Sequence, residues 1–179
     1  LMNPIQQLTD KIHASDLWEK EICIPRNGFL SKNGTIDTNL YYIQEGSIRI
    51  YVIDETEEQT IRFGYRNNFI AALDSFISET PSELYLQAIK KTQIKVLRKK
   101  TFMDFIDSSS EYLNLWKQIV GMLIYQQMER ERDILTSSPV ERYQRVLKRS
   151  PQLFQEVPHK YIASYLRMSP ETLSRIKKS

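Results

Sequence analysis

The end of the chain, residues 157–179, carries the polar groups best placed to do chemistry. A helix start is predicted at Ser169, because its side chain can accept hydrogen bonds from free backbone amides and Pro170 has no amide hydrogen to leave unbonded. Leu173 and Ile176 then share one helix face. The opposite face carries Glu171, Ser174, Arg175 and Lys178. A short helix with this face is suited to lie on a polar, negatively charged surface, and we interpret it as a DNA recognition helix.

The residues before this helix predict two further helices that hold it in place. Ser138 caps an amphipathic helix over Pro139–Ser150, with four apolar residues inward and four basic residues outward. Pro151–Glu156 follows as a one-turn connector. His159–Leu166 is the next helix, and it is joined to the last by a tight turn at Arg167 and Met168. The small side chain of Ala163 would let these two helices cross closely, which predicts a helix-turn-helix arrangement.

The charge distribution agrees with this interpretation. The chain has 179 residues and a net charge of +3. Residues 139–179 contain nine Lys or Arg and three Glu, a net charge of +6, and the other 138 residues have a net charge of −3. Such an asymmetry indicates a nucleic-acid or other anionic partner, whereas a solvated basic face is the alternative.

Residues 21–98 predict an antiparallel sheet structure. Short runs with alternating or apolar residues are separated by turns rich in Asn, Gly and acidic residues, and no helix is interleaved until Lys99. This pattern favours an antiparallel roll over alternating strands and helices. The six predicted strands are Glu21–Pro25, Leu40–Gln44, Ser47–Ile53, Gln59–Tyr65, Leu84–Ile89 and Gln93–Leu97. The one cysteine, Cys23, is expected to be buried in the first of them.

A long helix is predicted over residues 109–136, after a short one at Thr101–Ile106. Its apolar arc is too broad to be covered by a small roll, so we expect a helix–helix seam with a second copy of the chain. The predicted interface residues are Leu113, Trp116, Val120, Leu123 and Gln127. The alternative is that the helix packs only on its own sheet. The polar run at residues 126–133 predicts that the helix leaves the core there and approaches a hinge.

In this order, the elements resemble the Crp–Fnr family of bacterial transcription regulators. Two motifs carry the resemblance, YIQEGSIRIY at residues 42–51 and YIASYLRMSPETLSRI at residues 161–176. The second is similar to the version common among Bacteroidetes-type members. The resemblance implies an α+β chain with an antiparallel, jelly-roll-like β-roll domain at residues 1–108. A dimerisation helix and hinge at 109–136 and a small winged-helix or helix-turn-helix domain at 137–179 would follow.

The resemblance also implies how such a dimer would bind double-stranded DNA, with one recognition helix per subunit in successive major grooves. The family's base-reading positions match Pro170, Glu171 and Arg175, with Ser174 beside them. Arginine can bind guanine through two hydrogen bonds, and glutamate can accept from the cytosine amino group. Phosphate contacts would come from Lys160, Ser169, Thr172, Lys177 and Lys178. Glu171 could instead only complement the helix dipole, and Arg175 and Lys178 could only face solvent. RNA polymerase is a candidate further partner.

The chain departs from the family pattern at two places, the turn of the helix-turn-helix and the cyclic nucleotide site. Arg167 occupies a turn position that usually has glycine, which implies some backbone strain and leaves a phosphate contact open. Residues 69–84 lack the Gly-Glu and Arg-Ser pairs of the cyclic nucleotide site, and offer Asp74, Glu79 and Glu83 instead. Burial of a phosphodiester there without a paired cation would be costly, so no cyclic nucleotide and no other cofactor is expected. The sequence does not identify any other small molecule that would act as an effector.

Other classes of function find little support. One cysteine excludes an iron–sulfur cluster held by this chain, and two histidines make a haem or metal site improbable. No residue constellation or glycine-rich loop predicts an enzyme. The alternative function is a ligand-sensing or interaction module whose helix-turn-helix docks a protein. The lone cysteine, the lack of a recognisable signal peptide and the lack of a membrane-spanning run predict a cytoplasmic setting.

Overall fold

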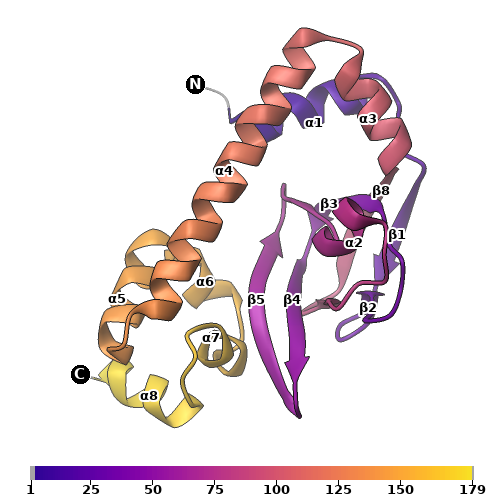
Figure 1. Cartoon of the computed structure of the whole chain (residues 1–179). Coiled ribbons are helices and arrows are strands. Elements are labelled where there is room, and N and C mark those ends of the chain that lie inside the picture. The colour runs from indigo at the N-terminus through magenta and orange to yellow at the C-terminus, as the bar shows by residue number, and fades with distance from the viewer. Residues whose placement is uncertain (1–2, 179) are drawn as a thin grey trace. The chain divides into compact units, whose positions relative to one another are not determined.

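The computed structural model describes residues 3–178, and its contacts divide them into two compact units (Figure 1). The first, called the roll unit, contains residues 3–52 and 62–121. The second, called the helical unit, contains residues 53–61 and 122–178. The elements are α1 (Pro4–Ala14), β1 (Lys20–Ile24), β2 (Phe29–Ser31), β3 (Asn39–Glu45), β4 (Ser47–Asp54), β5 (Glu57–Tyr65), β6 (Phe69–Ile70), α2 (Leu73–Ser78), β7 (Tyr85–Ala88), β8 (Thr92–Arg98), α3 (Lys99–Asp107), α4 (Ser110–Leu135), α5 (Pro139–Arg149), α6 (Pro151–Glu156), α7 (His159–Tyr165) and α8 (Pro170–Lys178).

The roll unit is built on two four-stranded sheets. Their strand orders are β1-β8-β3-β6 and β2-β7-β4-β5. The pairings β1–β8, β3–β8 and β4–β7 are antiparallel, as hairpin-rich sequences require. Inward residues of both sheets form one buried cluster, with Ile43 and Ile94 from the first sheet and Ile48 and Leu86 from the second. The structure thus confirms the antiparallel roll and all six predicted strands, and adds β2, β6 and α2.

The turn between β3 and β4 requires glycine. Gly46 has a φ of +98°, where residues with a side chain are strained. A Cβ atom at this position would also lie 2.7 Å from the carbonyl oxygen of Lys91 and clash with Thr92. This close approach of the turn to the start of β8 leaves no room for a side chain at Gly46.

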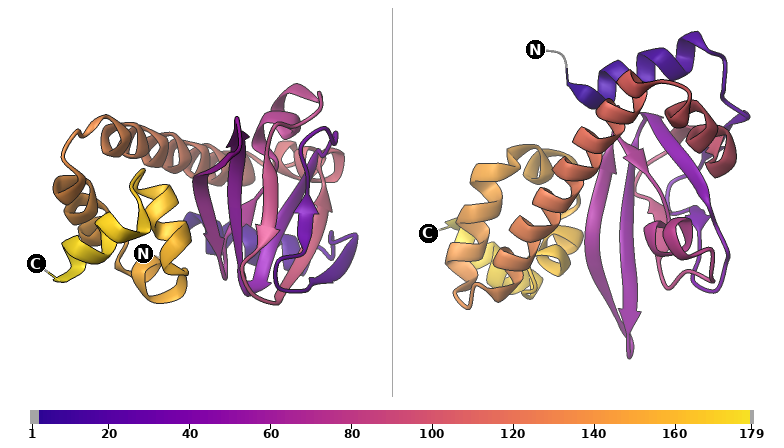
Figure 2. Two further views of the ribbon diagram at one scale, coloured as in Figure 1. Left: turned by 90° about the horizontal axis from the view of Figure 1, so that it is seen from below. Right: turned by 45° about the horizontal axis from the view of Figure 1, so that its top comes forward.

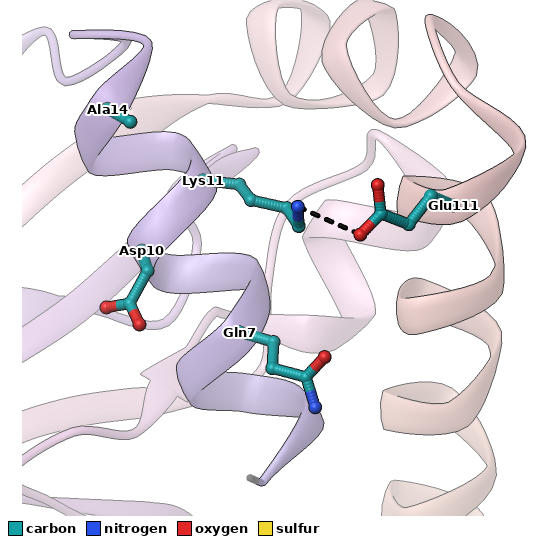
Figure 3. A pocket seen from close by; sticks show the side chains of 5 residues that line it. All are labelled: Gln7, Asp10, Lys11, Ala14 and Glu111. Atoms are coloured by element: carbon teal, nitrogen blue, oxygen red, sulfur yellow. Dashed lines mark ion pairs between the residues drawn. The ribbon is translucent and has the colours of Figure 1, made fainter.

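Helices α1, α3 and the first turns of α4 form a second buried cluster in the roll unit. Its fully buried members include Leu8 and Ile12 of α1 and Phe102 and Ile106 of α3. At the edge of this cluster, the Nζ atom of Lys11 lies 2.9 Å from a carboxylate oxygen of Glu111, in a surface recess that Gln7, Asp10 and Ala14 also line (Figure 3). The start of α4 is therefore held by its own roll unit.

The expectation that Cys23 is buried is wrong. Successive residues of a strand face opposite sides, and in β1 it is Ile22 and Ile24 that turn toward the core. Cys23 therefore faces outward and is exposed.

The helical unit contains α5 to α8, the second half of α4 and the tip of the β4–β5 hairpin (Figure 2). Helices α5 and α7 begin and end within two residues of their predicted bounds, and α8 begins one residue after its predicted start at Ser169. Residues 137–178 contain no strand, so the part of this domain that the structure describes has no wing. The unit also extends back into α4, whereas the predicted boundary was at residue 136.

Candidate nucleic-acid interface

The predicted cap of the last helix is present. The amide of Thr172 donates to Ser169 Oγ at 3.1 Å, and the amide of Leu173 donates to the Ser169 carbonyl at 3.0 Å. Pro170 occupies the first helical position, where a missing amide hydrogen costs nothing. The start of α8 is thereby fixed by local bonds alone.

Helices α7 and α8 pack through a small, tight core. Ile162, Ala163, Leu166 and Leu173 are each no more than 1% exposed. The amide of Met168 donates to the Ala163 carbonyl at 3.1 Å, so the chain folds back directly over this small residue. These contacts agree with the expectation that Ala163 permits a close helix crossing.

The turn between α7 and α8 has the strained geometry expected of a non-glycine residue. Arg167 has a φ of +54°, in the left-handed region. Its carbonyl accepts a hydrogen bond of 3.2 Å from Arg142 of α5, and the Leu166 carbonyl accepts one of 2.9 Å from the same guanidinium. Arg142 therefore caps the C-terminal end of α7 and stabilises the turn.

Most of the residues predicted to contact DNA are exposed in the structure. Lys160, Ser169, Pro170, Glu171, Arg175 and Lys178 are exposed, whereas Thr172 and Ser174 are half-buried. Arg175 Nη2 lies 3.4 Å from Thr172 Oγ1, which directs the guanidinium back along the exposed face of α8. Hydrogen bonds from its own backbone amide and from Ser169 lower the pKa of Glu171, so this side chain is a hydrogen-bond acceptor at neutral pH.

His159 is a positioning residue that sequence reasoning missed. Its Nε2 atom lies 3.1 Å from the Pro170 carbonyl oxygen and 3.2 Å from Ser174 Oγ. The first residue of α7 thus contacts the first and second turns of α8. The hydroxyl of Ser174, predicted to lie beside the base-reading residues, is engaged in this contact. No residue spacing in the sequence signals it, because the partners are 11 and 15 residues apart.

The prediction that all four basic residues of α5 point outward is wrong. Asp133 of α4 is fully buried, and its two carboxylate oxygens pair with Arg145 at 3.1 Å and with Arg149. Glu129 lies 3.5 Å from Arg145 and 3.7 Å from Arg149. With Arg142 committed to the turn, only Lys148 keeps the predicted outward role.

The same ion pairs involve residues 126–133, for which a hinge at the end of the helix stays a prediction. Glu129 and Asp133 of this run are bonded to α5 within the helical unit, so part of its polarity reflects an interhelical network. The side chains of Gln126, Gln127, Glu131 and Arg132 are exposed. A second buried residue of the run, Arg130, is 7% exposed. The helix continues without interruption to Leu135.

The predicted dimer residues lie in different environments. Leu113 and Trp116 pack against the helical cluster of the roll unit, where Trp116 makes an edge-to-face contact with Phe102 at 5.0 Å between ring centroids. Val120 and Leu123 are half-buried and Gln127 is exposed. A neighbouring face of α4 is apolar and exposed, and we call it the α4 stripe. It consists of Ile124, Tyr125, Met128 and Leu135, which are 56–82% exposed.

In the loop that corresponds to the family's cyclic nucleotide site, the carboxylate of Asp74 accepts the hydrogen bonds of nearby loop residues. Asp74 accepts hydrogen bonds from Ser82 Oγ at 2.7 Å, from the amide of Glu83 at 2.8 Å and from the amide of Ser75 at 2.8 Å. Burial raises the pKa of Asp74, but these hydrogen bonds outweigh it and lower the pKa below its usual value. The loop is thus organised around an internal anion.

Metal centres and membrane-spanning helices are two further features to consider in residues 3–178, the part of the chain that the structure describes. No group of three or more His, Cys, Asp or Glu residues is arranged to hold a metal ion in this part of the chain. Nor does any helix described there combine the length and apolar character needed to cross a membrane.

Comparisons with known proteins support the architecture. Residues 21–109 match the family model of the cyclic nucleotide-binding domain. No curated protein matches the chain in sequence.

Solved structures of bacterial regulators share the fold of most of the chain. FixK2 from Bradyrhizobium japonicum has a TM-score of 0.71 at 15% identity, over 89% of this chain and 82% of that one. The c-di-GMP-responsive regulator CLP of Xanthomonas campestris has a TM-score of 0.71 at 13% identity, over 97% of this chain and 90% of that one. The catabolite activator protein of Thermus thermophilus has a TM-score of 0.59 at 16% identity, over 98% of this chain and 85% of that one. The chain therefore has an antiparallel roll of the cyclic nucleotide-binding fold followed by helices, as in Crp/Fnr regulators.

The buried ion pairs of Asp133 generate a stability prediction. Asp133→Asn should lower the free energy of unfolding by about 3 kcal/mol, because two arginines would lose their buried counter-charge. Asp54→Asn, at an exposed position of the same unit, is the matched control and should change it by less than about 0.5 kcal/mol. Urea denaturation followed by circular dichroism measures both. Equal effects of the two substitutions would show that the pairs do not stabilise the fold.

Proposed function

We propose that the chain is a DNA-binding transcription regulator that acts as a homodimer and places α8 in the major groove. The exposed polar face of α8, held on a tightly packed α7–turn–α8 core, is the observation that carries this proposal. The fold shared with bacterial regulators supports it. A cytoplasmic location, RNA polymerase as a partner and the Bacteroidetes type of the motif stay predictions.

The roles on α8 follow from which groups are exposed. Arg175 and Glu171 would read base edges, since a guanidinium matches guanine and a carboxylate accepts from cytosine. Lys160, Lys178 and the amide-rich start of α8 at Ser169 and Pro170 would contact phosphates, which attract cations and helix N-termini. Thr172 is placed to orient Arg175. We give Ser174 a packing role against His159 in place of its predicted contact with DNA.

Arg175 provides the direct test of base reading. On a site selected from a random duplex library, Arg175→Ala should weaken binding by about 1–3 kcal/mol and relax one base position. Lys178→Ala is the comparison, and it should weaken all duplexes about equally because a phosphate contact carries no sequence information. Fluorescence anisotropy titrations against the selected and a scrambled duplex measure both. Unchanged affinity and unchanged specificity in Arg175→Ala would overturn this assignment of α8.

We propose that the dimer forms through the α4 stripe. An exposed apolar stripe along a long helix is stabilised when a second copy covers it, as in paired helices of oligomers. Two of the residues first predicted for this seam, Leu113 and Trp116, already pack within their own roll unit. The stripe therefore moves the expected seam around the helix and toward its C-terminal half.

Substitution of charge into the stripe tests this seam. Tyr125→Glu should shift the chain from dimer to monomer in sedimentation equilibrium, because it would place two like charges across an apolar contact. Gln126→Glu, on the other side of the same helix, should leave the dimer intact. Gln127→Glu separates the two seams, since only the first predicted seam contains it. A monomeric wild type, or dissociation by Gln127→Glu alone, would contradict the proposal.

We further propose that the roll does not bind a cyclic nucleotide. A phosphodiester in the loop would compete with Asp74 for its donors and would lie near the carboxylate of Glu83. The carboxylate of Glu79 is already paired with Lys99 at 2.7 Å. Desolvation of an anion beside carboxylates is unfavourable. Calorimetric titration with cyclic AMP should give no saturable heat, and a stoichiometric binding isotherm would contradict this part of the proposal.

A further inference from the structure

The tip of the β4–β5 hairpin is part of the helical unit. Residues 53–61 group with residues 122–178, although β4 and β5 themselves continue into a sheet of the roll. The tip is strongly acidic, with Asp54, Glu55, Glu57 and Glu58 all exposed. A negatively charged loop therefore lies within the unit that we propose to bind a polyanion.

Specific hydrogen bonds attach this hairpin to α7. Ser164 Oγ donates to the Glu58 carbonyl at 2.9 Å and accepts from the Thr60 amide at 3.1 Å. The hydroxyl of Thr60 lies 3.0 Å away from the same oxygen, and Thr60 is only 3% exposed. One serine of the helix-turn-helix thus closes a small polar cluster with the hairpin backbone.

Arg130 strengthens the attachment from α4. Its Nη2 atom donates to the Thr60 carbonyl at 3.2 Å, and its guanidinium lies 3.7 Å from the ring centroid of Tyr165. A buried guanidinium stacked on an aromatic ring and bonded to a carbonyl links hairpin, α4 and α7. The hairpin is therefore held at a defined position relative to α7.

This position brings the acidic tip beside the proposed phosphate contacts. One groove is lined by Glu57, Glu58 and Gln59 of the hairpin and, among others, by Lys160, Arg167, Ser169 and Pro170 of the helix-turn-helix. A DNA phosphate at Lys160 and the start of α8 would approach two carboxylates. Like charges at this separation repel each other, most strongly at low ionic strength.

We propose that the β4–β5 hairpin is an intramolecular latch that competes with DNA phosphates for the N-terminal side of the recognition helix. The proposal rests on the proposed DNA-binding function. Hydrogen bonds through Ser164 hold the latch, and Glu57 and Glu58 supply the competing charge. The latch is continuous with β4 and β5, which belong to a sheet of the roll. A conformational change of these strands would therefore act directly on the latch.

Charge removal from the groove tests the competing carboxylates. The double variant Glu57→Gln/Glu58→Gln of the full chain should bind a 30-base-pair duplex about three- to tenfold more tightly than wild type at about 50 mM salt. Asp54→Asn/Glu55→Gln is the matched control, since it removes two charges from the same hairpin outside the groove. If both variants gained duplex affinity equally, the effect would come from net charge alone, and the latch proposal would be overturned.

Ser164→Ala tests the attachment itself. It should speed amide hydrogen exchange at Thr60 in the free protein and tighten duplex binding. Weaker binding by Ser164→Ala would show that the contact positions the helix for DNA and does not oppose it. Addition of duplex to the wild type should likewise expose the Thr60 amide, and continued protection in the complex would overturn the latch.

The binding results separate failure of the latch from failure of the DNA-binding function. If wild type binds duplex and Arg175→Ala impairs it, but both hairpin pairs behave alike, the latch alone is wrong. If neither wild type nor any hairpin variant binds duplex at low salt, the proposed function is wrong and the latch falls with it.

Discussion

The fully buried carboxylate of Asp133 is the interaction on which the helical unit depends. It lies on α4 and pairs with two arginines of α5, so it fixes α5 on the long helix. A buried carboxylate is tolerated only where counter-charges satisfy it, which gives α5 a specific rotation about its axis. From that rotation, Arg142 reaches the carbonyls of Leu166 and Arg167 and supports the turn before α8. The recognition helix is positioned through this chain of contacts.

These contacts change which charges are available to a nucleic acid. Of the nine basic residues in 139–179, Arg142, Arg145 and Arg149 bond within the helical unit. The remaining cations include Lys160, Arg167, Arg175, Lys177 and Lys178, which follow the exposed side of α7, the turn and α8. The net charge of this region is therefore concentrated where the helix-turn-helix would meet a duplex, and the acidic hairpin lies next to it.

The local features could be predicted from sequence because they are determined by near neighbours. The caps at Ser138 and Ser169 form with residues three positions ahead, and the positive φ of Arg167 follows from the tight turn. The strands could be located from alternating apolar and polar residues, because this alternation is also a property of near neighbours. Long-range pairing could not be predicted in this way. Asp133 lies 12 and 16 residues from its arginines, and Thr60 lies 104 residues from Ser164.

The salt dependence of duplex binding tests the central claim most directly. If α8 and its flanking cations contact phosphates, the logarithm of the association constant should fall linearly with the logarithm of salt concentration. The expected slope is about −0.9 for each phosphate contacted, and several contacts per dimer would lower affinity by a factor of about 10² or more between 50 and 200 mM salt. A flat dependence, or no binding at the lower concentration, would contradict a DNA-binding role for this chain.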